Sequence, residues 1–401
     1  MSVTQGTGGS TSPTTLTYPC GQCGARLEYA PGTSVLKCPY CGHEQAVGPS
    51  DRVIEEHDYV AWQSSPVKAT AHLAQHVLRC GKCGATTETD DLATSCPFCG
   101  APIVAEIDAA EQIAPEGVVP FGIDRSGAQE AIRQWVRSRW FAPNRLRKVS
   151  TAERLKGTYL PHWTYDAATS TRYTGMRGEH YWETETYTEM VDGRPQTRTR
   201  QVMKTRWYPA SGQVARNFDD VVVVATRQLP AERLADLQPW LLENATAYQP
   251  EYLSGYQALR YDVQPDQGLE EAKQIMRGVI REDCCADIGG DEQQVHSMDT
   301  RYGALMFKLM LLPVWLAAYL YGGKTFQVYV NAHTGTVVGE RPYSPVKIAF
   351  AVLAALVVIG VVVAVYLANR SSGGSTSPGV VSGLLVHAWP AAAAHLGPLS
   401  P

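Results

Sequence analysis

The chain has 401 residues, of which 44% are hydrophobic and 18% are charged, close to the averages of globular proteins. This length predicts two or three separately folded units. The formal net charge of -4 excludes a polybasic body, so the chain as a whole offers no electrostatic reason to bind nucleic acid or an anionic lipid surface. Met1 is followed by small polar residues and not by a basic and then an apolar segment, which argues against a secretory signal peptide.

The first segment, 1–17, consists of small polar residues and is predicted to be disordered. Two cysteine-rich segments follow it, 18–48 and 78–104, and together they hold eight of the ten cysteines as four C-x-x-C pairs. The two pairs are fourteen residues apart in the first segment and twelve in the second, which is typical of zinc ribbons. The predicted ligands are Cys20, Cys23, Cys38 and Cys41 in the first ribbon and Cys80, Cys83, Cys96 and Cys99 in the second.

We expect two structural zinc ions, because four protein thiolates fill a tetrahedral site and leave no position for water or substrate. A glycine follows the second cysteine of every pair and permits the positive φ that such a turn requires. These glycines are Gly24, Gly42, Gly84 and Gly100. A redox-active cysteine pair, unligated core thiols and an iron centre are the alternatives. Ligand thiols must stay reduced, which predicts a reducing compartment such as the cytosol for this region.

The charge of the ribbon region indicates whether its partner is a protein or a nucleic acid. Residues 1–104 contain six basic and nine acidic side chains and no basic stripe, whereas strong phosphate binding depends on clustered Lys and Arg. A protein partner is therefore favoured over nucleic acid. The segment 49–77 is predicted to be a helical linker, in which His72 and His76 have the i, i+4 spacing of a metal pair but are expected to be ordinary helix residues.

The segment 119–342 is predicted to be a duplicated α+β domain with antiparallel strands, with repeats at about 121–215 and 261–342. In each repeat the sequence G-x-x-E-A opens a helix, and a strand with the sequence L-P-x-W follows. The matching residues are Gly127, Glu130 and Ala131 with Gly268, Glu271 and Ala272, and Leu160, Pro161 and Trp163 with Leu312, Pro313 and Trp315. Chance recurrence of short apolar motifs is the alternative.

Each L-P-x-W strand is expected to lead into an antiparallel hairpin. In the first repeat the turn sequence is DGRP, at 192–195. A four-residue loop there would set three attractive pairs opposite each other across the strands. They are Glu189 with Arg198, Glu183 with Lys204, and Tyr181 with Arg206. We interpret this hairpin as a solvated structural ribbon.

Near the C-terminus, 348–368 contains no charged residue, and at about 1.5 Å per residue such a run spans a hydrocarbon core of roughly 30 Å. We predict one transmembrane helix over 346–368, with a buried globular helix as the alternative. Basic residues are more frequent before the run than after it, which predicts a single-pass protein of the cell membrane with a cytoplasmic N-terminal region. The tail 369–401 is predicted to be disordered. The shorter apolar stretch 309–321 contains Pro313 and is expected to be a core strand.

The body shows no catalytic constellation in its sequence. The G-K-T sequence at 323–325 resembles the end of a phosphate loop, but the first glycine of that loop would stand where Ala318 does. The neighbours Cys284 and Cys285 are too close to chelate one metal comfortably or to form an easy disulfide, so core or surface thiols are expected.

Several stretches resemble the bacterial membrane-anchored TFIIB-type zinc-ribbon proteins. They are CPYCG, CPFCG, FDDVVVVAT, LQPW, GVIREDCCADIGGDEQQVHS and LLPVWLAAYLYGGKTFQVYVNAHTGTVVGERPYSPVKI, and the resemblance covers residues 18–368. Members of this group are often described as primosomal helicase or replication-factor-Y-like proteins, but the missing phosphate loop argues against helicase activity here. The resemblance implies that the eight ribbon cysteines are metal ligands. It also implies protein partners such as the phage-shock-protein-A-type and flotillin-like proteins of membrane-stress systems.

Three functions follow as hypotheses. The first is a non-enzymatic, membrane-anchored adaptor whose zinc ribbons dock cytoplasmic protein partners at the bacterial membrane. The second is a membrane-tethered protein that binds nucleic acid through its ribbons. The third is an enzyme with a pocket of convergent polar groups between the two repeats. We favour the adaptor because both predicted metal sites are closed, the ribbon region is acidic and one anchor is expected.

Overall fold

The computed structural model describes residues 15–16, 18–65, 76–79, 86–89, 93–95, 102–105, 113–138, 155–191, 194–321, 324–339 and 345–371. The chain divides into two compact units. The first holds the described residues up to 339, and the second holds the helix α5, Pro345–Ser371.

The first unit is built mainly from strands, and its largest sheet has twelve of them within the described residues. They are β1 (Thr15–Leu16), β5 (His57–Asp58), β8 (Ala93–Ser95), β9 (Pro102–Ala105), β10 (Gly117–Val118), β11 (Lys156–Val191), β12 (Arg194–Val224), β13 (Thr246–Ala247), β14 (Gln257–Ala258), β15 (Glu292–Tyr321), β16 (Lys324–Asn331) and β17 (Val337–Gly339). A three-stranded sheet contains β2 (Glu28–Tyr29), β3 (Val35–Lys37) and β4 (Glu44–Ala46), and a two-stranded sheet contains β6 (His76–Arg79) and β7 (Thr86–Thr89).

The first unit has four α-helices in its described residues, and the first two begin at a side-chain cap, Asp58 and Asp124. The helices are α1 (Tyr59–Ser64), α2 (Arg125–Arg137), α3 (Ala231–Ala235) and α4 (Pro265–Ile288), with 3-10 turns η3 (Leu242–Asn244) and η4 (Pro250–Leu253). The carboxylate of Asp124 accepts the N–H of Gly127 at 2.8 Å and so caps α2. On α4 one side chain in every three or four is buried, which gives the helix a single core-facing stripe.

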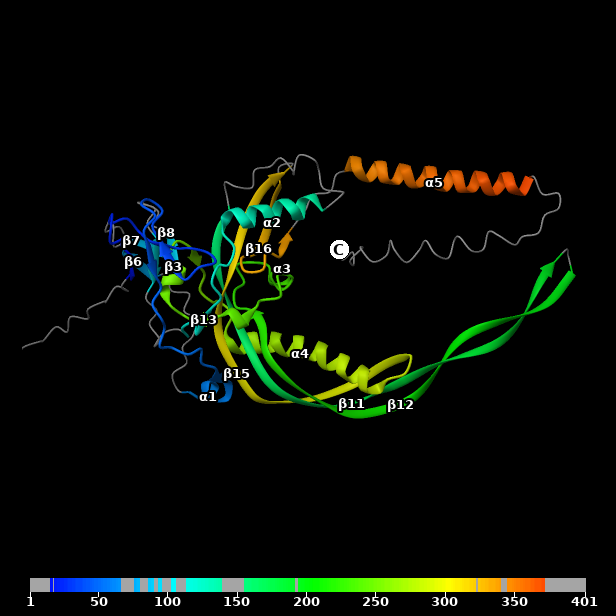
Figure 1. The fold of residues 1–401 in the computed structure, drawn as a ribbon. Coiled ribbons are helices and arrows are strands. Elements are labelled where there is room, and N and C mark those ends of the chain that lie inside the picture. The colour runs from blue at the N-terminus through cyan, green and yellow to red at the C-terminus, as the bar shows by residue number, and fades with distance from the viewer. Residues whose placement is uncertain are drawn as a thin grey trace, which may run out of the picture. The chain divides into compact units, whose positions relative to one another are not determined.

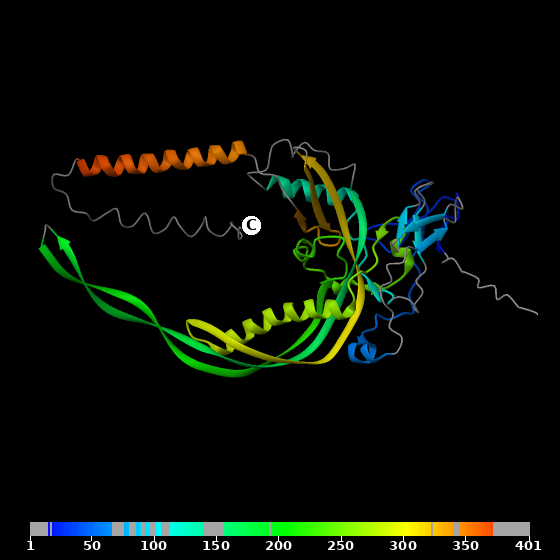
Figure 2. The ribbon, with the colours of Figure 1, turned by 180° about the vertical axis from the view of Figure 1, so that it is seen from behind.

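The centre of the unit is formed by the long strands β11, β12 and β15. β11 lies between the other two and pairs antiparallel with both. The helix α4 lies inside the curve of these strands and packs against all three (Figure 1). β15 begins at Glu292, opposite Gly178, so beyond Gly178 the described part of β11 pairs only with β12. Seen from behind, the β11–β12 hairpin therefore continues past β15 and α4 as a free two-stranded ribbon (Figure 2).

The strands β11 and β15 carry the two L-P-x-W sequences, and Leu160 lies directly opposite Leu312. The backbone hydrogen bonds around this pair also occur twice, in matching positions. On one side the bonds are Ala225 N to Pro161 O, Val263 N to Ala225 O and Leu259 N to Tyr159 O. The three bonds that match them, in the same order, are Ala332 N to Pro313 O, Ile123 N to Ala332 O and Val119 N to Leu311 O. A local two-fold axis that passes between Leu160 and Leu312 therefore relates the two sets of hydrogen bonds.

The two tryptophans of these strands make matching contacts too. Trp163 Nε1 donates to the carbonyl of Val263 at 2.8 Å, and Trp315 Nε1 donates to the carbonyl of Ile123 at 2.9 Å. Each tryptophan thus binds the segment that precedes the helix of the other predicted repeat. These contacts agree with two similar repeats, and the duplication itself stays a prediction.

The predicted α+β balance of the body is wrong. Only α1 to α4 are α-helical in the described part of this unit, and strands dominate it. β11, β12 and β15 run for 36, 31 and 30 residues, whereas a typical strand has about five or six. The sequence pattern predicts shorter strands in these stretches and therefore underestimates the sheet. The apolar stretch 309–321 does lie in a strand, as predicted.

The predicted transmembrane helix over 346–368 is not supported. Those residues do form a helix, α5, but within the described residues no helix is both long enough and apolar enough to cross a membrane. The location derived from that prediction, a single-pass protein of the cell membrane with a cytoplasmic N-terminal region, loses its support for the same reason.

The hairpin β11–β12 has a different register from the predicted one. Val191 pairs with Arg194, so two residues and not four connect the strands. Asp-Gly is a preferred sequence for such a two-residue connection. The three predicted pairs still meet, as diagonal neighbours: Glu189 with Arg198 at 3.2 Å, Glu183 with Lys204 at 2.8 Å, and the Tyr181 ring with the Arg206 guanidinium carbon at 4.7 Å.

The segments that flank the first ribbon differ from expectation as well. Thr15–Leu16 forms a strand that pairs with β9, within a segment predicted to be disordered. In the described part of the predicted helical linker 49–77, the helix found is the short α1, and His76 begins strand β6. Other predictions concern residues outside the described ones: the rest of 1–17, His72, the cysteines of the second ribbon and the tail beyond 371.

Candidate metal centre and its surroundings

The four cysteines of the first predicted ribbon lie together. Their sulfur atoms are all within 4.8 Å of one another, and the Cys20–Cys41 and Cys23–Cys38 sulfurs are 3.6 Å apart. A tetrahedral zinc ion with bonds of about 2.3 Å sets its sulfurs about 3.8 Å apart. All four cysteines are free thiols. The number, type and spacing of these donors fit one tetrahedral metal ion.

Two tight turns bring the sulfurs together. Gly24 and Gly42 have φ values of 67° and 74°, as predicted from their place after the second cysteine of each pair. Their N–H groups donate to the carbonyls of Cys20 at 2.9 Å and of Cys38 at 3.0 Å, which closes both turns. A residue with a side chain would be strained at either glycine, so the turn geometry depends on them.

The acidity of the thiols favours a bound cation. The backbone N–H of Cys41 lowers the pKa of Cys38 to about 6. The pKa of Cys41 rises to about 12, because the N–H of His43 lowers it less than burial and the neighbouring sulfurs raise it. Four thiols at this spacing cannot all ionise without a positive charge to balance them. A divalent cation would supply that charge.

The metal module, residues 18–48, packs against the body. Leu27 is fully buried, and its carbonyl accepts a hydrogen bond of 2.7 Å from the Ser254 hydroxyl. The backbone N–H of Tyr29 donates to the Ser254 carbonyl at 2.9 Å, and that of Gly32 donates to the Phe121 carbonyl at 2.7 Å. The inner face of the module is therefore occupied by the body and is not free for another partner.

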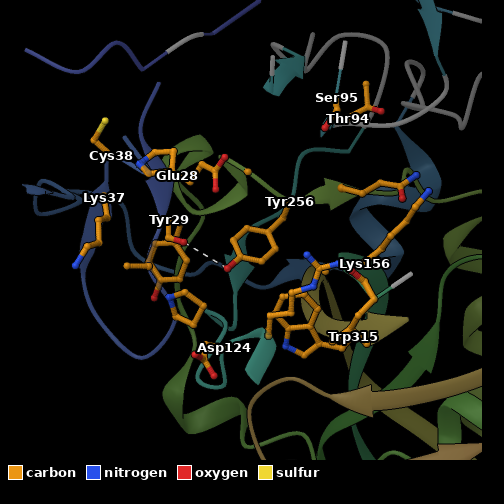
Figure 3. Close-up of a pocket in the computed structure, with 18 of the residues that line it drawn as sticks. Glu28, Tyr29, Lys37, Cys38, Thr94, Ser95, Asp124, Lys156, Tyr256 and Trp315 are labelled. Atoms are coloured by element: carbon orange, nitrogen blue, oxygen red, sulfur yellow. Dashed lines mark hydrogen bonds between the residues drawn. The ribbon is translucent and has the colours of Figure 1, made fainter. Parts of the chain in front are cut away.

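A pocket of about 850 Å³ lies between the metal module and the body (Figure 3). Its walls include Glu28, Tyr29 and Lys37 of the module and Asp124, Arg125, Lys156, Tyr256 and Trp315 of the body. The Tyr256 hydroxyl donates to the Tyr29 carbonyl at 3.4 Å and bridges the two walls. Burial raises the pKa of Glu28.

Most charged groups of this pocket serve the fold. Lys37 pairs with Glu44 at 2.9 Å, and Arg125 donates to the Leu155 carbonyl at 2.9 Å. Asp124 caps α2. These contacts fix the walls of the pocket in place.

A partly buried ion-pair cluster around the buried Lys308 was not predicted from the sequence. The Lys308 ammonium lies 2.8 Å from the Glu56 carboxylate and 2.7 Å from that of Asp220. The neighbouring Asp166 accepts the N–H of Asp220 at 2.7 Å, and its pKa rises to about 6, mainly through burial. The three carboxylates lie close enough for a metal, and Lys308 already forms ion pairs with two of them, Glu56 and Asp220. The cluster joins the segment before β5 to the three long strands.

Another buried polar residue, His162, was also missed. It is fully buried on β11, and its Nδ1 lies 3.0 Å from the Leu160 carbonyl. Its Nε2 has no hydrogen-bond partner among the described residues. No spacing rule marks this histidine, because its neighbours come from strands and helices far along the chain.

Beyond Gly178 the free ribbon has two different faces, since side chains alternate along each strand. One face, which we call the charged face, holds Tyr181, Glu183, Glu185, Tyr187, Glu189, Gln196, Arg198, Arg200, Val202 and Lys204. Its acids lie on β11 and its basic residues on β12, and they pair with one another. Lys204 contacts both Glu183 and Glu185, and Arg200 contacts Glu185 at 3.1 Å.

From Trp182 outward, the opposite face of the ribbon contains no Asp, Glu, Lys, Arg or His, and we call this part the neutral face. It consists of Trp182, Thr184, Thr186, Thr188, Met190, Pro195, Thr197, Thr199, Gln201 and Met203. His180, on the same side but next to the body, pairs with Glu292 at 2.8 Å. Trp182 lies directly opposite Met203, and these side chains are 67% and 51% exposed. Met190 is 66% exposed. Large apolar side chains this exposed, on a face without charges, are typical of interaction surfaces.

Cys284 and Cys285 serve packing rather than chelation. Cys284 is buried on the core-facing stripe of α4, and its pKa is raised by burial. Cys285 lies at the edge of that stripe and is half-buried. Both are free thiols, as expected from their adjacency in the sequence.

Comparison with known proteins gives one distant likeness in sequence. No family model matches the chain, and no solved structure matches it significantly. The chain is similar to the uncharacterized protein YdjG of Bacillus subtilis (strain 168), with 24% identity over 347 residues, covering 83% of this chain and 92% of the relative. The likeness extends over most of both chains and leaves the family and the function to be inferred from the site.

Proposed function

We propose that this chain is a non-enzymatic adaptor, in which a structural zinc ion fixes the metal module to the body and the free ribbon docks a protein partner. The observation that carries the proposal is the neutral face. The Glu, Arg and Lys side chains of the free ribbon all lie on its other face, where they pair with one another. The neutral face is left to Trp182, Met203 and Met190, three large exposed side chains.

Zinc is the metal that this donor set favours. Four thiolates in tetrahedral positions suit zinc, and they leave no open position at which water could be activated. The role of the ion is then to hold the two turns together against the body, so its removal should loosen residues 18–48 without directly affecting the ribbon.

A second zinc ion at Cys80, Cys83, Cys96 and Cys99 is part of the proposal. Each C-x-x-C pair is flanked by two described residues that pair with each other across a β-ladder or bridge, and six residues lie between the two in every case. The enclosing pairs are Pro19–Arg26 and Lys37–Glu44 in the first ribbon and Arg79–Thr86 and Ser95–Pro102 in the second. Equal spacing around equal turn sequences supports a second site of the same kind. Metal analysis of the purified protein tests it, with two zinc ions per chain expected.

The neutral face also indicates what kind of partner it takes. A charged partner surface would lose water contacts there and gain no ion pair in return. An uncharged protein surface with apolar and hydroxyl side chains could bury the tryptophan and methionines and hydrogen-bond the threonines. The phage-shock-protein-A-type and flotillin-like proteins suggested by the resemblance are the first candidates to assay.

Site-specific crosslinking tests this docking surface. A photo-reactive amino acid replaces Trp182 on the neutral face in one variant and Tyr187 on the charged face in another, both in the full chain. We expect adducts with a partner from position 182, and few or none from position 187. Both positions lie on the same strand of the same ribbon, so local concentration and mobility are matched.

Affinity capture provides an independent readout. The double variant Trp182→Ser and Met203→Ser should lose the partner, while Tyr187→Ser should retain it. The same proteins captured by the wild type and by the double variant would rule out docking through the neutral face. Unchanged thermal unfolding of both variants checks that the body remains folded.

Nucleic-acid binding is the second candidate, and the paired charges disfavour it. The basic side chains Arg198, Arg200 and Lys204 of β12 each contact a glutamate and offer phosphate no unbalanced positive stripe. A salt titration with single-stranded DNA and RNA, starting at about 50 mM, distinguishes the two functions. Salt-sensitive binding there would favour nucleic acid over a protein partner.

A further inference from the structure

A second pocket, of about 400 Å³, lies at the base of the ribbon where β12 ends between α3 and α4. Its walls are mainly apolar. They include Val222, Val223 and Val224 of β12, Leu234 and Ala235 of α3, Trp240, and Ile275 of α4. Nothing in the proposed docking role uses this pocket, and the inference below does not depend on that role.

His162 is the one buried polar side chain in this wall. Its side chain is 0% exposed, on β11 directly opposite Val224. The Leu160 carbonyl can only accept a hydrogen bond, so Nδ1 at 3.0 Å must carry the proton and donate. In the neutral ring Nε2 is then an acceptor, and it has no partner among the described residues.

The ring stays neutral at ordinary pH. Burial lowers the pKa of His162 to about 4, although the Leu160 carbonyl acts in the opposite direction. The charged groups in the lining are two acids, Glu232 and Glu271. An anionic ligand would meet their negative charge, so a ligand without negative charge is favoured.

A buried acceptor without a donor is costly, because the nitrogen has given up its hydrogen bond to water. A mainly apolar pocket of this size, with one buried and unpartnered acceptor among its lining residues, is complementary to a compact apolar molecule with one donor. We propose that this pocket binds a small uncharged apolar molecule, aromatic or aliphatic, whose single hydroxyl or N–H group donates to Nε2 of His162.

Phenol and anisole are suitable probes, because the methyl ether has a similar ring and lacks the donor. The full chain is titrated with each, and binding is followed by the ¹⁵N shift of His162 Nε2 and by the methyl signals of Val222 and Val224. We expect saturable binding of phenol with a shift of Nε2. Anisole should bind roughly tenfold more weakly, since the loss of one buried hydrogen bond has about that effect.

Two variants test whether the probes bind in this pocket and not elsewhere on the chain. His162→Phe should remove the preference for phenol over anisole. Should that variant fail to fold, Ala235→Trp serves instead, since Ala235 is exposed at the pocket wall and the larger ring would fill the pocket. It should abolish binding of both probes and leave thermal unfolding unchanged. Equal affinity for phenol and anisole, no saturable binding by either, or phenol binding that persists in Ala235→Trp would each overturn the inference.

Discussion

The two ends of the β11–β12 hairpin are stabilised in different ways. Near the body β11 pairs with β15 as well as with β12, α4 covers the strands, and Trp163 and Tyr165 of β11 are completely buried. Beyond Gly178 the same two strands have no third strand and no covering helix in the described structure, and only surface pairs link their side chains. Exposed ion pairs contribute little to stability, whereas each buried aromatic side chain contributes several kilocalories per mole.

The base of the hairpin therefore contributes to the stability of the fold, whereas the free ribbon is available for binding. The base is fixed by burial and tolerates few changes. The free ribbon owes its shape to strand pairing and to the charged face, and its neutral face is available because folding does not use it. Substitutions at the base should therefore affect unfolding, and substitutions in the free ribbon should affect binding.

The largest contrast is expected between two tryptophans. Trp163 is fully buried, stacks edge-on against Tyr261 at 5.0 Å and donates to the Val263 carbonyl, so Trp163→Ala should lower the free energy of unfolding by about 3–5 kcal/mol. Trp182→Ala, on the exposed neutral face, should change it by no more than about 0.5 kcal/mol. Urea unfolding of both variants measures the difference. Similar losses in the two would show that the ribbon belongs to the core.

His162, at the base of the β11–β12 hairpin, should make the free energy of unfolding depend on pH. Its pKa is lowered to about 4 by burial, from an ordinary value near 6.5. Below about pH 6.5 the unfolded chain binds a proton that the folded chain does not bind until about pH 4. Stability from this group is therefore complete above pH 6.5 and is lost as the pH falls through that window, by up to about 3 kcal/mol.

Urea unfolding at several pH values between about 4 and 7 measures this loss. In His162→Phe the part of the slope due to His162 should disappear, whereas Trp182→Ala, which removes no ionisable group, should keep it. An NMR titration of the His162 ring gives the same information without a variant. A ring that protonates near pH 6.5 in the folded chain would refute the buried neutral state.

Asp166 should give the free energy of unfolding the opposite pH dependence. Burial raises its pKa to about 6, and the neighbouring Glu56 adds to the effect. Stability from a raised carboxyl pKa is complete below the unfolded value, about 3.8, and is lost as the pH rises through about 6. Asp166→Asn should therefore gain stability relative to the wild type as the pH rises from about 4 to 6. A constant difference between the two proteins across that range would contradict this origin of the shift.

Much of the metal centre could be predicted from the sequence, because the ligand number and the turn glycines are local properties. Four cysteines and two glycines within residues 20–42 were sufficient, and the structure places Gly24 and Gly42 at positive φ as required. Whether the second set of cysteines forms a site of the same kind is still a prediction, since those residues lie outside the described ones.

Features that depend on distant contacts were predicted less well. The charged pairs of the hairpin were identified correctly, but the register was wrong by two residues because the connection is shorter than assumed. His162 and Lys308 were missed, because their environments combine segments more than fifty residues apart in the chain. The uncharged run 348–368 does form a helix, but its composition alone led to a membrane assignment that the structure does not support.

The smallest expected effect concerns the charged face itself. Lys204 contacts Glu183 at 2.8 Å and Glu185 at 3.0 Å, and all three side chains remain substantially exposed. Lys204→Ala should leave global unfolding almost unchanged. It should speed amide hydrogen exchange in the free ribbon by at most about fivefold, because an exposed ion pair contributes only slightly to the local opening equilibrium.

High salt should reduce this difference, since salt screens exposed charges more than buried ones. Lys204→Arg, which keeps the charge, is the matched control and should exchange like the wild type. Amides at the base, near Trp163, should be unaffected in both variants. Faster exchange at the base in Lys204→Ala would mean that the two regions unfold together, and the division between a fixed base and a separately opening ribbon would then be wrong.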